Sequence, residues 1–240
     1  MKIIDELIST LTYEVPAKDI RQGAFQTAVL TRHCGLASTP HNPGPHPIGM
    51  PVNGAGLLLE KNLQFLVRMA NSQSPMESAI GMATINSLIE VDERRCAELN
   101  AAELLIRKGK DKRVAIVGHF PFVHQLRKVA KELWIIERNP RAGDLTEADA
   151  EKFIPRADVI GITGTAFTNH TIEHLLELCK PSAYVVTLGG TTPLSTILFD
   201  HGVDAVSGTV VIDTELVLRY VSQGATFRQI KGIRLVTLEK

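Results

Sequence analysis

The sequence predicts an α/β protein in which a small α+β N-terminal domain (residues 1–110) precedes a mostly parallel sheet domain (residues 111–240). The main observation is a set of four short apolar runs, each ending at Gly, Pro, Asn, Thr or charge: RVAIVGHFP (113–121), LWIIERNP (133–140), ADVIGITGT (157–165) and AYVVTLGG (183–190). Runs of this kind are typical of strands buried on both faces. Helical patterning lies between them, and such alternation implies a parallel sheet.

The first part of the chain begins with a predicted helix and a small antiparallel meander. Residues 1–14 place apolar side chains at helical spacing, from Ile3 to Leu11, and Pro16 ends the helix. Residues 18–39 change to strand patterning with a turn at Gly23, which predicts two strands and a third short one. The segment TPHNPGPHPIGMP (39–51) must be a loop, because it holds five prolines and two glycines. Its His41 and His46 are either metal ligands or solvated polar residues, and we favour the second interpretation.

Further helices are expected over residues 57–71, after the Ser74-Pro75 cap, and over residues 93–109. The second of these carries small residues that allow another backbone to approach closely. Near its end Asn86 is either a satisfied core amide or a group presented to a site. After Asp204 the sequence predicts a strand, a helix over 212–222 and a last apolar run that ends at Leu238.

Composition excludes several classes of function. Lys+Arg and Asp+Glu both number 26, and no basic stripe interleaved with aromatic residues appears, so nucleic acid is not expected as a partner. No apolar run approaches the roughly 20 residues that cross a bilayer, so no membrane partner is expected. The first residues carry acids within their apolar run, which does not fit a secretory signal. Three widely spaced cysteines without a CxxC motif fit free thiols and a cytoplasmic location.

The candidate site lies in the loops that follow the predicted parallel strands, because such sheets bind ligands at the carboxyl ends of their strands. These loops are Gly118–Pro121, Glu137–Asp144, Thr163–Asn169 and Gly189–Pro193. The first has neither the G-x-G-x-x-G nor the P-loop pattern. Glu137 nevertheless follows Gly118 by 137 − 118 = 19 positions, close to the spacing of a ribose-binding acid. The alternative is that Glu137 caps its loop by pairing with Arg138 or Arg141.

Two other loops are polar and rich in glycine. TGTAFTNHT holds five Thr or Asn residues within nine positions, where a helix cap needs only one, so this turn could hold an anion or carboxylate. In LGGTTPLS, Gly189 and Gly190 would let backbone approach a ligand, and Thr191 or Thr192 would cap a helix that begins at Pro193. Two such turns on one edge of a sheet predict a binding crevice.

Metal ligation is a separate hypothesis. His33 and Cys34 beside His119 would make a cluster suited to a divalent transition metal if the fold brought them together, although strand-end roles are the favoured interpretation of the first two. His170 and His174 match H-x-x-E-H, but the positive end of a helix disfavours a cation there. No motif indicates a Ser or Cys nucleophile.

The loop sequences resemble a known family. GHFPF, ERNPRAGD, ADVIGITGTAFTNHT, LGGTTPL and FDHGVDAVSG, in this order over roughly residues 112–225, resemble the prokaryotic "putative heavy-metal chelation" family of unknown function. PMESAIGMATINS resembles the helix that ends its N-terminal domain. The resemblance implies an enolase N-terminal-like domain followed by a Rossmann-like domain, with a site at their interface. One departure is visible: the family often has G-P-S-T-P where this chain has Gly189-Gly190-Thr191-Thr192-Pro193.

Carried onto this chain, the resemblance implies a site that combines the first domain with the loops of the second. The implied residues are Asn86, Gly118, His119, Phe120, Glu137, Asp144, Thr163, Gly164, Thr165, Asn169, Gly189 and Thr191. We expect this cleft to bind a small polar or anionic ligand, with or without a transition metal. His119 and Glu137 are the candidates for acid–base work, and Glu137 and Asp144 for binding hydroxyls or a cation.

Two alternatives stay open. One is an enzyme that uses a nucleotide or adenosyl-type ligand in the Rossmann-like half, with Glu137 on its ribose, and the other is a metal-sequestering protein without catalysis. The sequence leaves the cofactor unknown, apart from a divalent transition metal as a candidate. It also leaves open whether the protein is an enzyme and whether it forms a homo-oligomer.

Overall fold

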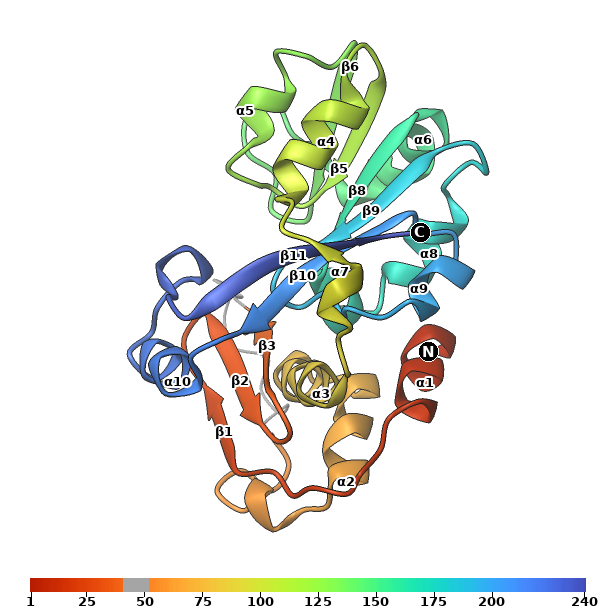
Figure 1. Ribbon diagram of the computed structural model, residues 1–240. Coiled ribbons are helices and arrows are strands. Elements are labelled where there is room, and N and C mark those ends of the chain that lie inside the picture. Colours follow the sequence, from red (N-terminus) through yellow and green to blue (C-terminus); the bar gives the residue numbers. More distant parts are fainter. Residues whose placement is uncertain (41–51) are drawn as a thin grey trace.

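The computed structural model describes residues 1–40 and 52–240, and the chain forms two β-sheets (Figure 1). The small sheet is antiparallel in the order β1-β2-β3, which is the meander that the sequence predicted. Its strands are β1 (Asp19–Gln22), β2 (Gln26–Leu30) and β3 (Cys34–Ser38). Most of the predicted Pro-rich loop, with His41 and His46, lies outside the described residues.

The large sheet has eight strands in the order β4-β11-β10-β9-β8-β5-β6-β7. Its strands are β4 (Cys96–Ala97), β5 (Arg113–Val117), β6 (Glu132–Glu137), β7 (Leu145–Thr146), β8 (Val159–Thr163), β9 (Tyr184–Leu188), β10 (Ala205–Val211) and β11 (Ile233–Glu239). The six strands from β10 to β7 run parallel, and only β11 and β4 are antiparallel to their neighbours. Taken from β5 as the first strand, the parallel part has the doubly wound order 3-2-1-4-5-6. The predicted fold class, a small α+β part followed by a mostly parallel sheet, is confirmed.

Four of the ten α-helices in the described residues begin where a polar side chain caps them. Asn62, Ser74, Asn100 and Asp213 each accept a hydrogen bond from a backbone N–H in the first turn of the helix that follows. The helices are α1 (Lys2–Ser9), α2 (Leu63–Arg68), α3 (Pro75–Leu88), α4 (Ala101–Gly109), α5 (Val123–Leu126), α6 (Ala150–Phe153), α7 (Thr165–Thr168), α8 (Ile172–Glu177), α9 (Ile197–Asp200) and α10 (Thr214–Ser222).

Three predicted helices are shorter than expected. The helix expected over residues 1–14 ends at Ser9. The one expected over 57–71 is broken, because Asn62 starts α2 and 3₁₀ turns flank it. The one expected over 93–109 begins at Ala101, because residues 96–97 pair with β11 as the strand β4.

Helix α3 lies at the centre of the N-terminal part, packed on the small sheet and on α2 (Figure 1). Small residues allow the backbones of neighbouring segments to come close to α3, as the sequence predicted for this helix. A Cβ atom on Gly35 would lie 2.1 Å from the Ala83 carbonyl oxygen, and one on Gly81 would lie 1.9 Å from the Ala70 nitrogen. Glycine at these two positions therefore allows the close contacts of the helix with β3 and with the 3₁₀ turn at Met69–Asn71.

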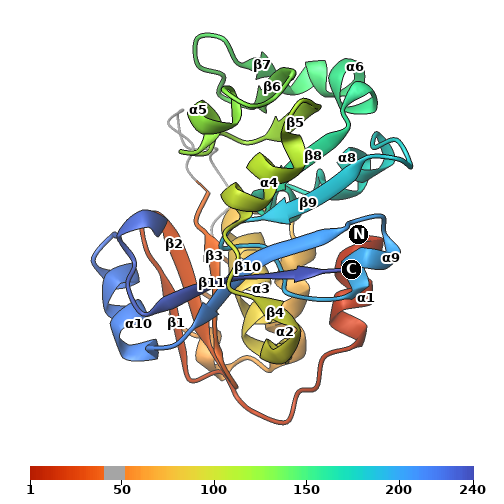
Figure 2. The same ribbon diagram turned by 45° about the horizontal axis from the view of Figure 1, so that its top comes forward.

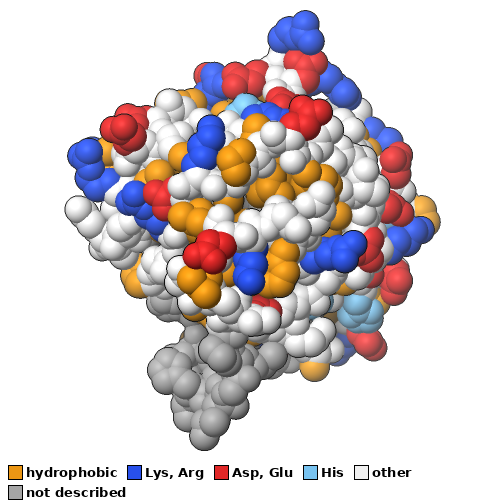
Figure 3. Space-filling view, turned by 90° about the horizontal axis from the view of Figure 1, so that it is seen from below, with side chains coloured by type: hydrophobic (Ala, Val, Ile, Leu, Met, Phe, Trp, Pro, Cys, Tyr) orange, Lys and Arg blue, Asp and Glu red, His pale blue; other side chains and the backbone are white. Residues whose placement is uncertain are grey.

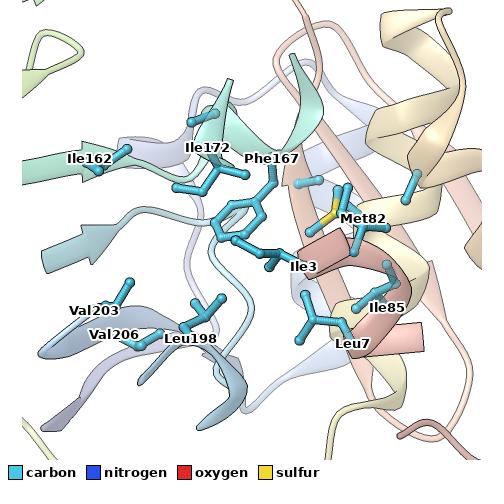
Figure 4. Packing of buried hydrophobic residues seen from close by; sticks show 14 of the residues in the cluster. Ile3, Leu7, Met82, Ile85, Ile162, Phe167, Ile172, Leu198, Val203 and Val206 are labelled. Atoms are coloured by element: carbon cyan, nitrogen blue, oxygen red, sulfur yellow. The ribbon is translucent and has the colours of Figure 1, made fainter. Parts of the chain in front are cut away.

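One hydrophobic core runs through both parts of the molecule. Figure 4 shows Ile3 of α1 and Met82 of α3 packed near Phe167 of α7, with residues of the large sheet beside them. Helix α10 packs on β1 and β2, and α1 packs against α9 (Figure 2). The domain boundary at residue 110 remains a prediction. No helix in the described ranges is long and apolar enough to span a bilayer.

Candidate functional site

A pocket of about 220 Å³ lies at the C-terminal ends of β5, β6 and β8. Strand β5 lies between β6 and β8, so the chain reverses its direction of travel across the sheet at this point, which is where doubly wound sheets bind ligands. The pocket is lined by seven of the predicted site residues: Gly118, His119, Phe120, Glu137, Thr163, Thr165 and Asn169. The structure thus brings together the loops that follow three different strands.

The loop after β5 turns sharply at Gly118 and presents His119. Gly118 has a φ of 101°, a conformation that favours glycine, and a Cβ there would lie 3.1 Å from the Thr163 Cβ. The His119 Nδ1 atom lies 3.0 Å from Oδ2 of Asp144, which also accepts the Arg141 backbone N–H at 3.0 Å. The Asp144 side chain is only 4% exposed. Because a carboxylate can only accept, Nδ1 donates and Nε2 keeps its lone pair for another partner.

Glu137 ends β6 and lines the same pocket. Its Oε1 accepts the Arg138 backbone N–H at 2.8 Å, so the loop-capping interpretation is correct for one oxygen. The Arg138 side chain pairs instead with Glu147, 3.2 Å away. Among the described residues Oε2 of Glu137 makes no hydrogen bond, so half of the carboxylate is free to accept from a ligand.

The polar turn after β8 satisfies most of its own hydrogen bonds. The hydroxyls of Thr163 and Thr165 lie 3.1 Å apart, and Oδ1 of Asn169 accepts both the N–H and the hydroxyl of Thr171. The helix that follows, α7, has four residues, so its N-terminus supplies no extended dipole of the kind expected for an anion site. Thr165 and Asn169 contribute to the pocket as neutral wall residues.

The loop after β9 lies outside the pocket and forms hydrogen bonds that connect the large sheet to the N-terminal part of the chain. Thr191 is buried; its hydroxyl accepts the Ser38 N–H at 2.9 Å, and its carbonyl accepts from Nδ2 of Asn86 at 3.1 Å. Asn86 also donates to the carbonyl of Leu36, at 2.9 Å. Neither Asn86 nor the predicted residues Gly189, Gly190, Thr191 and Thr192 line the pocket.

Gly164, another predicted site residue, fits closely against this loop. A Cβ on Gly164 would lie 2.6 Å from both the nitrogen and the hydroxyl of Thr192. Gly190 in turn packs against the Phe227 ring. The ligand-binding roles predicted for Asn86, Gly164 and the 189–192 loop remain predictions.

The structure does not bring His33 and Cys34 together with His119 as a metal cluster. Cys34 is buried under α10, and burial raises the pKa of its thiol to about 12, so it is not a thiolate at neutral pH. The His33 side chain is half exposed, and its Nε2 lies 3.4 Å from Oε2 of Glu90. His170 and His174 do not form a pair of zinc ligands on one helix face. His170 precedes α8, and its Nε2 lies 2.8 Å from the Ala70 carbonyl oxygen.

The described residues do not fit a heavy-metal centre built from protein donors alone. They contain no group of three or more His, Cys, Asp and Glu side chains that could hold a metal ion. Soft metals favour thiolates, yet burial raises the pKa of Cys179 to about 12, as it does for Cys34. At the pocket His119 offers a single imidazole nitrogen.

Several pocket residues had no signal in the sequence. Glu147, Ala150 and Leu175 line the pocket from segments between the strands, where nothing distinguishes them from ordinary surface and core positions. Helix capping at residues 146–149 and apolar spacing in α8 are visible in the sequence, but neither shows which side chains reach the pocket.

Comparison with known proteins agrees with this architecture. An uncharacterized protein of Methanocaldococcus jannaschii is 29% identical over 187 residues, which cover 75% of this chain and 72% of that protein. A crystal structure of a protein of unknown function from the DUF364 family, from Desulfitobacterium hafniense, superposes with a TM-score of 0.86 at 25% identity. A DUF364 protein of unknown function from Pyrococcus horikoshii superposes with a TM-score of 0.82 at 22% identity. Each of the two structures is matched over 100% of this chain and 98% of its own.

Two family models match the chain, one over residues 4–89 and the other over residues 100–240, and both carry the description "Putative heavy-metal chelation". The second alone covers more than half of the sequence. The chain therefore belongs to this family, the one that the loop sequences resemble.

Proposed function

We propose that the protein binds a small polar organic ligand in the pocket at the C-terminal ends of β5, β6 and β8. The observation that supports this most directly is a pair of acceptors on its wall, Nε2 of His119 and Oε2 of Glu137, for which the described residues supply no hydrogen-bond partner. They stand at the strand-order reversal of a doubly wound sheet, the place where such sheets bind ligands. Two acceptors beside threonine hydroxyls suit a ligand that carries hydroxyl or N–H donors.

His119 also determines how a metal would take part in ligand binding. An imidazole whose Nδ1–H is held by a buried carboxylate is oriented to use Nε2 as a metal ligand or as a base. With one nitrogen from His119 and at most one carboxylate oxygen from Glu137, the other coordination positions would fall to the ligand. The proposal is therefore an organic ligand, free or as a chelate, and not a bare ion enclosed by protein donors.

The test compares ligand-induced stabilisation in matched variants. Thermal unfolding is followed with ribose and adenosine as neutral probes, and the wild type is also analysed by native mass spectrometry for small molecules that co-purify. A ligand at 100 times its dissociation constant adds about 2.7 kcal/mol. We expect Glu137→Gln and His119→Gln to lose the shift, and Glu151→Gln, an exposed acid on α6 that does not line the pocket, to keep it.

Equal shifts in all four proteins would contradict the proposed pocket. So would the absence of any shift together with the absence of any co-purifying small molecule.

A further inference from the structure

A second and wider hollow lies beside the pocket. It measures about 810 Å³ and is more open, and His119 and Phe120 line both hollows. We name it the basic basin after the four cationic side chains on its wall: Arg127, Lys128, Arg141 and Arg228. Because His119 and Phe120 line both hollows, the two adjoin, and a group bound in one lies next to the other.

The charge of the basin is of one sign. None of the described residues that line it is acidic. In the described part of the chain none of the four cations forms an ion pair, as is also true of Arg68, Arg95, Arg156 and Arg219. What distinguishes the four is that they line one hollow together. Asp144 contacts the wall residue His119, but its side chain is only 4% exposed and its Oδ2 already accepts from His119 and from the Arg141 backbone N–H. On the face shown in Figure 3, by contrast, acidic and basic side chains are interspersed.

The basin is built by three segments far apart in the sequence. Arg127 and Lys128 follow α5, Arg141 lies in the loop between β6 and β7, and Arg228 comes from the 3₁₀ turn at Phe227–Gln229. That turn is fixed in place: the Thr226 hydroxyl and N–H both donate to Oε1 of Gln229, and the Phe227 ring packs against Gly190. Cations gathered from three segments are not explained by the local charge pattern of any one of them.

The opposite wall is also held rigidly. The rings of Phe120 and Phe122 stack with centroids 5.3 Å apart, and Nδ1 of His124 donates to the Pro121 carbonyl at 2.8 Å. The loop with the Phe120 and Phe122 rings and the turn that carries Arg228 are held by these contacts, which lowers the cost of ordering the backbone around a bound oxyanion.

We propose that the basic basin binds a multivalent oxyanion, the phosphate or carboxylate groups of the ligand whose polar part occupies the pocket. Guanidinium groups bind such groups through paired N–H donors, and four cations match more than one negative charge. The assignment of both groups to one molecule rests on the proposed function of the pocket. The binding of an oxyanion in the basin does not depend on it.

Isothermal titration calorimetry with inorganic pyrophosphate and with citrate tests the basin and separates phosphate from carboxylate ligands. The variants are the double substitution Arg127→Gln/Lys128→Gln and the single substitution Arg228→Gln, all at exposed positions without ion pairs. The control is Lys110→Gln/Lys231→Gln, which removes two exposed positive charges outside the basin. We expect at least one of the two anions to bind, with affinity lowered about tenfold or more by the double variant, lowered several-fold by Arg228→Gln, and unchanged in the control.

Equal losses in the control and the basin variants would mean that the anions respond only to net charge, and would overturn the proposal. Failure of both anions to bind the wild type at millimolar concentration would overturn it as well. Pyrophosphate and citrate carry no sugar-like part for the pocket, so their binding reports on the basin. The neutral probes report on the pocket, and the two proposals can therefore fail separately.

Discussion

The two ends of the same parallel strands use charge in opposite ways. At the N-terminal ends Asp158, just before β8, accepts three hydrogen bonds from Arg113 of β5 and one from Lys180. Asp204 similarly accepts the Val185 N–H of β9 at 2.8 Å. At the C-terminal ends Glu137 keeps an unused oxygen, His119 keeps an unused nitrogen, and four nearby cations have no acidic partner among the described residues.

This difference separates structural from functional charge. Charges that pair with one another fix the spacing of neighbouring strands and leave nothing for a ligand. Charges without partners contribute little to folding, and those that gather around one hollow are available to a ligand. The comparison predicts that substitutions of charged side chains lower stability more at the N-terminal ends of the strands and lower ligand binding more at the C-terminal ends.

The largest loss of stability is expected for Gly164→Ala, because the backbone of Gly164 packs directly against the backbone of Thr192. A Cβ there would lie 2.6 Å from the Thr192 nitrogen, and the φ of −60° means that collision alone is added. We expect a loss of about 3 kcal/mol in urea unfolding. The control is Gly143→Ala, where φ is 91° and nothing lies within 4 Å, so that only backbone strain of about 1 kcal/mol is added. Equal losses in the two variants would contradict the close fit of the 164 and 192 loops.

Asn86→Ala tests whether the hydrogen bonds that connect α3 to the loop after β9 stabilise the protein. The substitution removes two hydrogen bonds and leaves the buried carbonyls of Leu36 and Thr191 without that donor. We expect a loss of about 2 kcal/mol in the free energy of unfolding. A loss below about 0.5 kcal/mol would instead leave Asn86 as a residue presented to a ligand, as the sequence alternative had it.

Acid should weaken the N-terminal end of the strands. Hydrogen bonds from Arg113 and Lys180 hold the pKa of Asp158 well below its usual range. The stability from the ionised carboxylate is therefore present above the unfolded-state pKa, about 3.9, and is lost as pH falls toward the lower folded-state pKa. Because the group is partly exposed, the effect is about 1 kcal/mol.

The measurement is urea unfolding at pH 7 and pH 3 for the wild type, Asp158→Asn and a control, Asp200→Asn. We expect the acid-induced loss to be smaller in Asp158→Asn than in the other two proteins. An equal loss in all three would show that the ion-paired end does not respond to acid in this way.

The smallest effect on stability is expected at Glu137→Gln. The amide oxygen can still accept the Arg138 N–H, so we expect a change within about 0.5 kcal/mol, together with the loss of neutral-probe binding. A loss of stability above about 1 kcal/mol with binding intact would make Glu137 a structural loop cap, and would remove the contrast between the two ends.

Much of the framework was predictable because it depends on neighbours along the chain. The apolar runs that became β5, β6, β8 and β9 end at turns whose residues are visible in the sequence. The 19-residue spacing placed Glu137 at a strand end beside the Gly118 turn, and both line the pocket. Parallel strands present their C-terminal ends on one edge, so this part of the site follows from secondary structure alone.

Other parts of the site were decided only by tertiary packing. The loop at 189–192 has the same Gly and Thr composition as a ligand-binding turn. Asn86 of α3 and Ser38 of the small sheet nevertheless form hydrogen bonds with it, so it connects the N-terminal part of the chain to the large sheet. The sequence offered Cys34 as a candidate metal ligand, but in the structure α10 covers it. In both cases the deciding partner lies more than 100 residues away, and its position is not written in local spacing.

By itself, then, the sequence determined the strands β5, β6, β8 and β9, their parallel pairing and the edge on which a site would form, but not the short strands β4 and β7. Local apolar periodicity and turn chemistry are sufficient for that, because they act over a few residues. Only the tertiary structure decided which polar groups keep an unused hydrogen-bonding atom and that Arg228 joins Arg127 and Arg141 around one basin. Those outcomes depend on which distant side chains meet as the shared core packs, and no local pattern encodes that meeting.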